Sequence, residues 1–155
     1  MAAVLDELDR KILAVIQRDA TLSLDDLAKR VASSRTPVWN RMRKLRRAGV
    51  IKREVAILDP AAVGMGACFY VLVRTSEHAK DWQQRFLDAL HRHPEIQEAH
   101  RLAGDVDYLL KVRVEDTADY DRFYQALVAD VSLFNVTSLL SMQELISRTE
   151  LPLDR

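Results

Sequence analysis

The stretch SSRTPVWNRMRKLRRAGVIKR, residues 33–53, constrains the fold more than any other part of the sequence. It contains eight Lys or Arg and no Asp or Glu, although the whole chain carries 23 residues of each sign. Thr36 is a good N-cap, Pro37 suits a first helical turn, and Gly49 stands where a C-terminal cap belongs. At about 100° per residue, the apolar side chains fall on one stripe, formed by Val38, Met42 and Leu45. We therefore expect a helix that packs on one side and presents a basic surface on the other.

The excess of positive over negative charge lies in the first third of the chain. Residues 1–53 carry 13 Lys or Arg against 6 Asp or Glu, whereas residues 54–155 carry 10 against 17. No acidic residue occurs between Asp26 and Glu54. Two halves of opposite charge are typical of a module for a polyanion joined to a module with another task. A merely solvated surface helix is the alternative interpretation, but such helices usually mix both signs.

Two shorter helices are expected before the basic one. Apolar residues at helical spacing predict the first over about 6–18, with Asp6 and Asp9 near its start, where the helix dipole favours acids. Ser23 opens the second with a capping-box-like sequence, and this helix is expected to end near Ala32. Three short helices with a tight turn before the last describe a helix-turn-helix, whose last helix enters the DNA major groove.

The outward side chains of the third helix are chemically suited to DNA. Arg and Lys can donate to guanine O6 and N7, and Asn40 can pair with adenine, whereas Lys52 lies farther along and is expected to meet a phosphate. Trp39 is expected to pack at the edge of the apolar stripe rather than stack on a base. The predicted DNA-binding residues are Ser34, Arg35, Thr36, Asn40, Arg41, Arg43, Lys44, Arg47 and Lys52.

The remainder of the chain predicts a mixed domain with the order βαββαβ, the split βαβ or ferredoxin-like arrangement. The expected strands cover about 66–74, 96–102, 108–114 and 136–147, and the expected helices cover about 79–92 and 117–129. The fold class is therefore α+β, with a winged-helix-like helix-turn-helix domain over 1–53 and an αβ domain over 66–155. A connecting strand and linker are expected over 54–65.

The first strand of the αβ domain suggests an assembly. Residues 69–73 are apolar in succession, so both faces of that strand favour burial, yet the two predicted helices can cover only one face of the sheet. A second copy of the domain is the simplest cover for the other face. We therefore expect a homodimer.

Three stretches of the chain together resemble the Lrp/AsnC family, the leucine-responsive or feast/famine regulators of bacteria and archaea. They are LDELDRKILAVIQRDATLSLDDLAKRV, SSRTPVWNRMRKLRRAGVIKREVAILDPAAVG and EAHRLAGDVDYLLKV, and they span most of the sequence. Three shorter stretches, TPVWNRMRKL, GDVDYLL and the terminal ELPL, are most similar to the DecR-like branch, which includes a cysteine-responsive regulator. The resemblance implies a DNA-binding domain linked to an effector-binding, dimerising domain, with dimers that often assemble into octamers.

The family resemblance also implies an effector site at the loop joining the second and third strands of the αβ domain. An amino acid commonly binds there, and glycine would let backbone N–H groups approach its carboxylate while Asp107 pairs with its ammonium. Ordinary hairpin chemistry explains the same Gly-Asp sequence equally well. Relatives usually have a Pro-Gly-Val segment before the last strand, which this chain lacks. The predicted effector-binding residues are Leu102, Ala103, Gly104, Asp105, Asp107 and Ser138.

Signals for catalysis, metal binding and membrane insertion are weak, so we expect no catalytic residue, metal or cofactor. His91 and His93 lie about 200° apart on a helix and cannot share a ligand, and His78 and His100 stand in no motif. Cys68 is better read as a core residue than as a nucleophile. No apolar run approaches the length of a membrane span and no leader is evident, so a cytoplasmic, nucleoid-associated protein is expected.

Two alternatives to an effector-responsive regulator remain open. Sirohaem decarboxylases resemble the same family in fold, and His100 and Arg101 lie near the region where such an enzyme would bind a tetrapyrrole. The basic helix would have no role in that chemistry. The other alternative is an architectural protein that binds DNA broadly and needs no effector.

Overall fold

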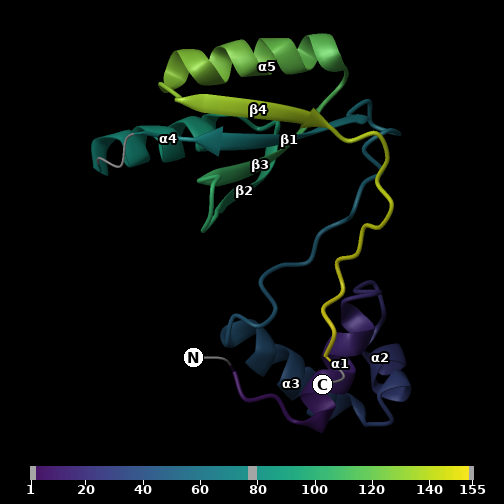
Figure 1. Ribbon diagram of the computed structural model, residues 1–155. Coiled ribbons are helices and arrows are strands. Elements are labelled where there is room, and N and C mark those ends of the chain that lie inside the picture. The colour runs from purple at the N-terminus through teal and green to yellow at the C-terminus, as the bar shows by residue number, and fades with distance from the viewer. Residues whose placement is uncertain (1–2, 77–79, 154–155) are drawn as a thin grey trace. The chain divides into compact units, whose positions relative to one another are not determined.

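The computed structural model describes residues 3–76 and 80–153, which form two compact units. The helical unit comprises the chain up to Ala56 together with the residues from Leu145 onward. The sheet unit comprises residues 57–144 (Figure 1). The chain therefore leaves the helical unit once and returns to it near its end.

The helical unit contains the three expected helices, α1 (Glu7–Ile16), α2 (Leu24–Arg30) and α3 (Arg35–Arg47). Ser23 caps α2 as predicted, with its hydroxyl accepting from the N–H of Asp26 (3.1 Å). Gly49 has φ +70° just past the end of α3, as a C-terminal cap requires. The stripe of α3 is buried in the core that the three helices share, together with apolar residues that include Ile12 and Leu27.

Two sequence expectations for this unit were wrong. Thr36 is not the N-cap of α3, because the helix begins earlier and Ser34 occupies that position without a side-chain capping bond. The connecting strand expected within residues 54–65 does not form, because no neighbouring segment of the described chain offers those residues a ladder of hydrogen bonds.

The sheet unit has the predicted order β1 (Ala67–Arg74), α4 (Lys80–Arg92), β2 (Ile96–Arg101), β3 (Tyr108–Val114), α5 (Thr117–Asp130) and β4 (Asn135–Leu140). All pairings are antiparallel, and the strand order β2-β3-β1-β4 confirms the ferredoxin-like arrangement. The start expected for α4, near residue 79, lies outside the described residues. β4 ends at Leu140, well before the expected residue 147. Its partner β1 begins at Ala67, two residues beyond the Phe69–Leu140 pair, so β1 is too short to pair with residues as far as 147.

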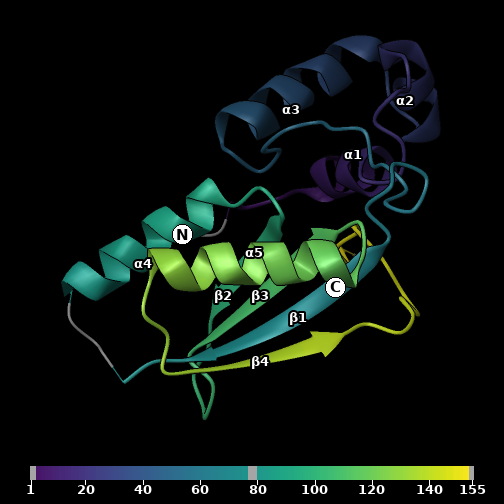
Figure 2. The same ribbon diagram turned by 90° about the horizontal axis from the view of Figure 1, so that it is seen from above.

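Both helices cover the same face of the sheet (Figure 2). Val71 and Val73 of β1 and Leu110 and Val112 of β3 point to that face, where they are fully buried beneath Trp82 and other side chains of α4 and α5. Successive strand residues point to opposite faces. The alternate residues of these strands, Tyr70, Leu72, Arg74, Leu109, Lys111 and Arg113, therefore make an open face that neither helix covers.

Candidate DNA interface and effector site

The outward face of α3 is basic and exposed. Eight of the nine predicted DNA-binding residues have exposed side chains, and the remaining one, Arg41, is half-buried. Asn40, Arg43, Lys44 and Arg47 line one shallow, open depression along the helix. The structure thus brings together, on one continuous surface, the groups that can read base edges and those that can neutralise phosphates.

Arg41 has a different environment from its neighbours. Its guanidinium pairs with Asp6 and reaches Asp9 at 3.3 Å, and its side chain is 32% exposed. Asp6 and Asp9 also cap α1 reciprocally, with the N–H of Asp9 donating to Asp6 at 2.9 Å. That bond and the Arg41 guanidinium lower the pKa of Asp6. Arg41 therefore joins α3 to the start of α1, and its geometry suits positioning of the helix more than contact with DNA.

Asp9 is the anchor of this junction, because it is a buried carboxylate only 1% exposed. Lys44 approaches it from the next turn of α3 at 3.7 Å. A buried carboxylate is tolerated only with such partners. The sequence placed Asp9 near the helix start for dipole reasons but gave no sign of its burial.

Trp39 supports Arg43 in a way that the sequence did not indicate. The indole is 48% exposed, and the Arg43 guanidinium lies over its ring, 4.5 Å from the centroid. Such stacking holds a long side chain in one orientation and reduces the entropy lost when it binds. Trp39 thus supports the Arg43 guanidinium through its exposed ring, a contact that its expected position at the edge of the apolar stripe did not predict.

The loop between β2 and β3 is held in a defined shape. Leu102 N–H donates to the Asp107 carbonyl (2.8 Å), and Asp107 N–H donates to the Val73 carbonyl (3.1 Å). The Asp107 carboxylate accepts from the Thr75 backbone N–H (2.8 Å), a structural contact with the residue that follows β1. Gly104 has φ +146°, a backbone conformation that favours glycine.

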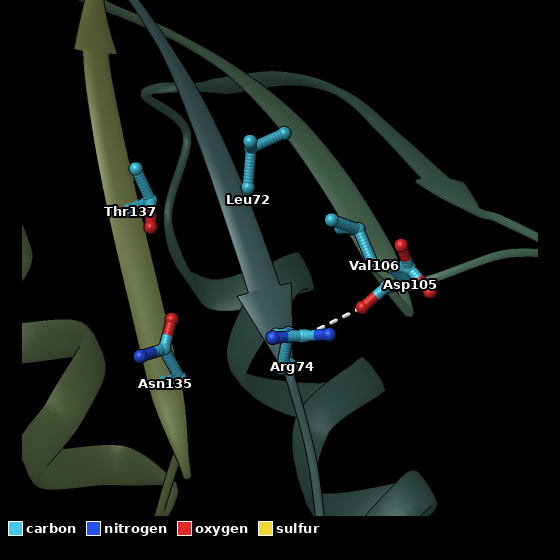
Figure 3. A pocket seen from close by; sticks show the side chains of 6 residues that line it. All are labelled: Leu72, Arg74, Asp105, Val106, Asn135 and Thr137. Atoms are coloured by element: carbon cyan, nitrogen blue, oxygen red, sulfur yellow. Dashed lines mark hydrogen bonds between the residues drawn. The ribbon is translucent and has the colours of Figure 1, made fainter.

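A hollow of about 270 Å³ lies beside this loop, on the open face of the sheet. Arg74 stands at its centre and donates from Nε to the Asp105 carbonyl at 2.5 Å (Figure 3). The hollow is lined by Leu72 and Arg74 of β1, Asp105 and Val106 of the loop, and Asn135 and Thr137 of β4. A guanidinium, an amide and an acidic residue therefore line the hollow, which suits a small zwitterion.

Only Asp105 of the predicted effector residues lines this hollow. Ser138 faces the other side of the sheet, where its hydroxyl shares a hydrogen bond with that of Tyr120, and burial raises the pKa of that tyrosine. Its neighbour Thr137 points into the hollow instead, because successive strand residues face opposite ways. Arg74 was not among the predicted residues, because the sequence gives no sign that strand pairing brings it beside this loop.

The histidines that the structure describes assemble no metal site. Within the described ranges, no group of three His, Cys, Asp or Glu side chains is placed to hold an ion. His93 meets Asp130 at 3.0 Å and His100 meets Glu98 at 3.4 Å, whereas His78 lies outside the described residues. A hydrogen bond from Lys111 lowers the pKa of Glu98, so His100 faces an acid that is already paired. In the same ranges, none of the helices is long and apolar enough to cross a membrane.

Two family models match the chain, and both agree with its two units. The model described as the Lrp/AsnC ligand binding domain matches residues 68–151, and the model described as a winged helix-turn-helix DNA-binding domain matches residues 5–52.

Similar proteins cover almost the whole chain. It is 43% identical over 153 residues to the glutamate uptake regulatory protein of Zymomonas mobilis, covering 99% of this chain and 93% of that protein. It is 41% identical over 152 residues to the DNA-binding transcriptional activator DecR of Escherichia coli, covering 97% and 100%. A solved transcriptional regulator of Neisseria meningitidis in complex with L-Met superposes with a TM-score of 0.92 at 30% identity, covering 97% of this chain and 98% of that chain.

Proposed function

Because the chain belongs to the Lrp/AsnC family of DNA-binding transcriptional regulators, we propose that it recognises specific DNA sites and adjusts its binding to an amino acid. The observation that carries the proposal is the basic outward face of α3, where Arg43, Arg47 and Lys52 have no carboxylate within 4.0 Å among the described residues. The relatives are named as regulators, which supports a role without catalysis.

In this proposal the residues of α3 divide their work. Asn40 and Arg43 reach base edges in the major groove and supply sequence preference, each good bidentate contact contributing about 1–3 kcal/mol. Arg47 and Lys52 neutralise phosphates and contribute affinity without sequence information. Ser34, Arg35 and Thr36, at the start of α3, lie where the helix first meets the duplex.

The effector in this proposal is an α-amino acid that occupies the hollow beside the β2–β3 loop. Arg74 pairs with its carboxylate, and the Asp105 carboxylate pairs with its ammonium. The similar regulator solved with L-Met supports an amino acid as the class of effector. The effector shifts the balance among assemblies or DNA geometries, which requires that it bind those states with different affinities.

We further propose that the protein acts as a homodimer, able to assemble into octamers, in the cytoplasm and on the nucleoid. The open face of the sheet carries the apolar side chains Leu72 and Leu109 and the 49% exposed Leu139, which a second copy would cover. Two helical units in a dimer would place their α3 helices in successive major grooves, about 34 Å apart, on a palindromic site.

Fluorescence anisotropy tests the proposal directly. The protein is titrated onto the DNA upstream of its own gene and onto a scrambled duplex, across a salt series, with and without each amino acid. We expect tighter binding to the upstream DNA, a steep loss with salt from phosphate contacts, and a shift with one amino acid. Equal binding to both duplexes without any amino-acid response would indicate an architectural protein instead. Absence of binding at low salt would contradict a DNA-binding role and direct attention to tetrapyrroles.

A further inference from the structure

A short segment near the end of the chain, Glu150–Leu153, lies against helix α1. The Gln17 side-chain amide makes two hydrogen bonds with the backbone of Leu151. Its Nε2 donates to the Leu151 carbonyl (3.0 Å), and its Oε1 accepts from the Leu151 N–H (2.9 Å). Arg10 Nη1 donates to the Leu153 carbonyl (3.0 Å). The Leu153 side chain is half-buried and packs against the core of the three helices.

The spacing of these contacts describes a built site on one face of the helix. Arg10 and Gln17 are seven residues apart, which is two turns, so their side chains project from the same face. Gln17 meets Leu151 and Arg10 meets Leu153, so the segment runs antiparallel to α1.

The contacts recognise the backbone more than the side chains. The hydrogen bonds from Arg10 and Gln17 all involve main-chain groups of the segment, and the Leu151 side chain is 69% exposed. The side-chain contribution is the half-buried Leu153, with a distant ion pair between Arg18 and Glu150 (3.9 Å). The site therefore fits a peptide that presents its backbone groups to α1 and packs one apolar side chain against the helical core.

We propose that this face of α1 is a docking site for the chain's own C-terminal segment, and that the docked segment is a second tether of the DNA-binding unit. The chain leaves the helical unit at Ala56 and returns at Leu145, so the docked segment adds a second, non-covalent connection that a free end would not provide. A second connection restricts the orientations that the unit can adopt. It thereby raises the effective concentration of the second helical unit of a dimer at the second half-site.

Hydrogen exchange of the full-length protein tests the docking without DNA. We expect the Leu151 amide to exchange slowly in the wild type and about tenfold faster in Gln17→Ala, because its acceptor is removed. Arg10→Met should accelerate the same amide through loss of the second contact. Lys11→Ala is the matched control, since Lys11 lies on the same helix and pairs with Glu7. Equal Leu151 exchange in the wild type, Gln17→Ala and Arg10→Met would overturn the docking site.

Binding to spaced half-sites tests the tether, which rests on the proposed function. Footprinting first locates the two half-sites upstream of the gene. Binding is then measured on three duplexes: the natural site, the same site with about 5 base pairs (half a helical turn) inserted between the half-sites, and a single half-site. Gln17→Ala should bind the single half-site as the wild type does, bind the natural site about threefold more weakly, and lose less affinity on insertion. Identical spacing profiles would overturn the tether. A wild type that binds no duplex would contradict the proposed function, and the exchange experiment would still decide the docking.

Discussion

The outward face of α3 and the open face of the sheet both carry basic side chains, but their charges are compensated differently. On the sheet, Lys111 pairs with Glu98 (3.1 Å) and Arg113 pairs with Glu144 (2.8 Å). On α3, Arg43 and Arg47 have no such partner in the part of the chain that the structure describes. Charge neutralised within the molecule serves its own structure, whereas uncompensated positive charge attracts an external polyanion.

The same contrast occurs within α3. Arg41 and Arg43 are two residues apart and point to different sides, so one is held by Asp6 and Asp9 while the other lies over Trp39 in solvent. Counting charges along the sequence treats these two arginines alike. The two arginines differ because the acidic residues at the start of α1 lie beside Arg41 and not beside Arg43. Arg41 therefore holds α3 in place, whereas Arg43 is free to contact DNA.

The largest effect is expected from Arg43→Ala. Loss of a base-reading guanidinium should weaken binding to the preferred DNA site by about 1–3 kcal/mol and relax preference at particular base pairs. Anisotropy with the natural site and with single base-pair substitutions measures both effects. Arg122→Ala, at an exposed arginine of α5 that pairs with Asp119 (2.9 Å), is the matched control and should leave DNA affinity unchanged. An equal loss from the two variants would show that Arg43 makes no specific contact with DNA.

Asp9→Asn should have the next largest effect, because it removes the buried negative charge that faces Arg41 and Lys44 of α3. Arg41 and Lys44 lose a buried acceptor of charge, and we expect the free energy of unfolding to fall by about 1–2 kcal/mol. Urea unfolding measures this change. Asp25→Asn, at an exposed acid that meets Arg35 at 3.4 Å, should change it by less than about 0.5 kcal/mol. Similar losses would show that burial of Asp9 has no special role.

Local patterns predicted most of the fold because the signals are themselves local. The alternation of Tyr108, Leu110, Val112 and Val114 located β3 at its observed bounds, and Gly49 marked the end of α3. Ser34 and Thr36 are both good caps, and the choice between them depends on how α3 packs, which periodicity does not report. β4 is shorter than its apolar pattern because strand length is set by the partner strand.

The candidate sites were predictable only where one element carries them. The predicted DNA-binding residues all lie on α3 or close to it in the sequence, so the periodicity of one helix was enough to predict them together. The hollow draws on β1, β4 and the β2–β3 loop, and Arg74 comes to it through strand pairing between distant segments. Ser138 and Thr137 are adjacent but face opposite sides of the sheet, and only Thr137 lines the hollow, a difference that the sequence alone does not show.

Arg74→Met extends the comparison to the hollow on the open face. Arg74, unlike Arg113, has no carboxylate within 4.0 Å in the described ranges, so it resembles the residues of α3. The variant should weaken the amino-acid response by about tenfold in effector concentration while DNA affinity without effector is unchanged. Asp107→Ala tests the prediction from the sequence that the Asp107 carboxylate pairs with the ammonium of the amino acid. A full loss in Asp107→Ala with a normal Arg74→Met would favour the loop carboxylate over the hollow.

Lys52→Ala should have a smaller and uniform effect. A lysine that meets a phosphate contributes to all duplexes alike, so affinity should fall about threefold on natural and scrambled DNA, and the salt slope should decrease by about 1. Anisotropy across the salt series measures both. A change confined to the natural site would instead assign Lys52 to base recognition.

The smallest effect is expected from the ion pair at the start of α1, and it should depend on pH. The N–H of Asp9 and the Arg41 guanidinium lower the pKa of Asp6 in the folded unit. The carboxylate therefore stabilises the fold above the ordinary aspartate pKa, and this contribution is lost as the pH falls through the lowered value. Asn is also a good N-cap, so Asp6→Asn removes the charge while keeping the cap. Urea unfolding of wild type and variant should differ at neutral pH and converge below about pH 4. If the difference in unfolding free energy between wild type and Asp6→Asn did not change as the pH fell, the Asp6 charge would not hold Arg41. Asp9 and packing alone would then distinguish Arg41 from Arg43.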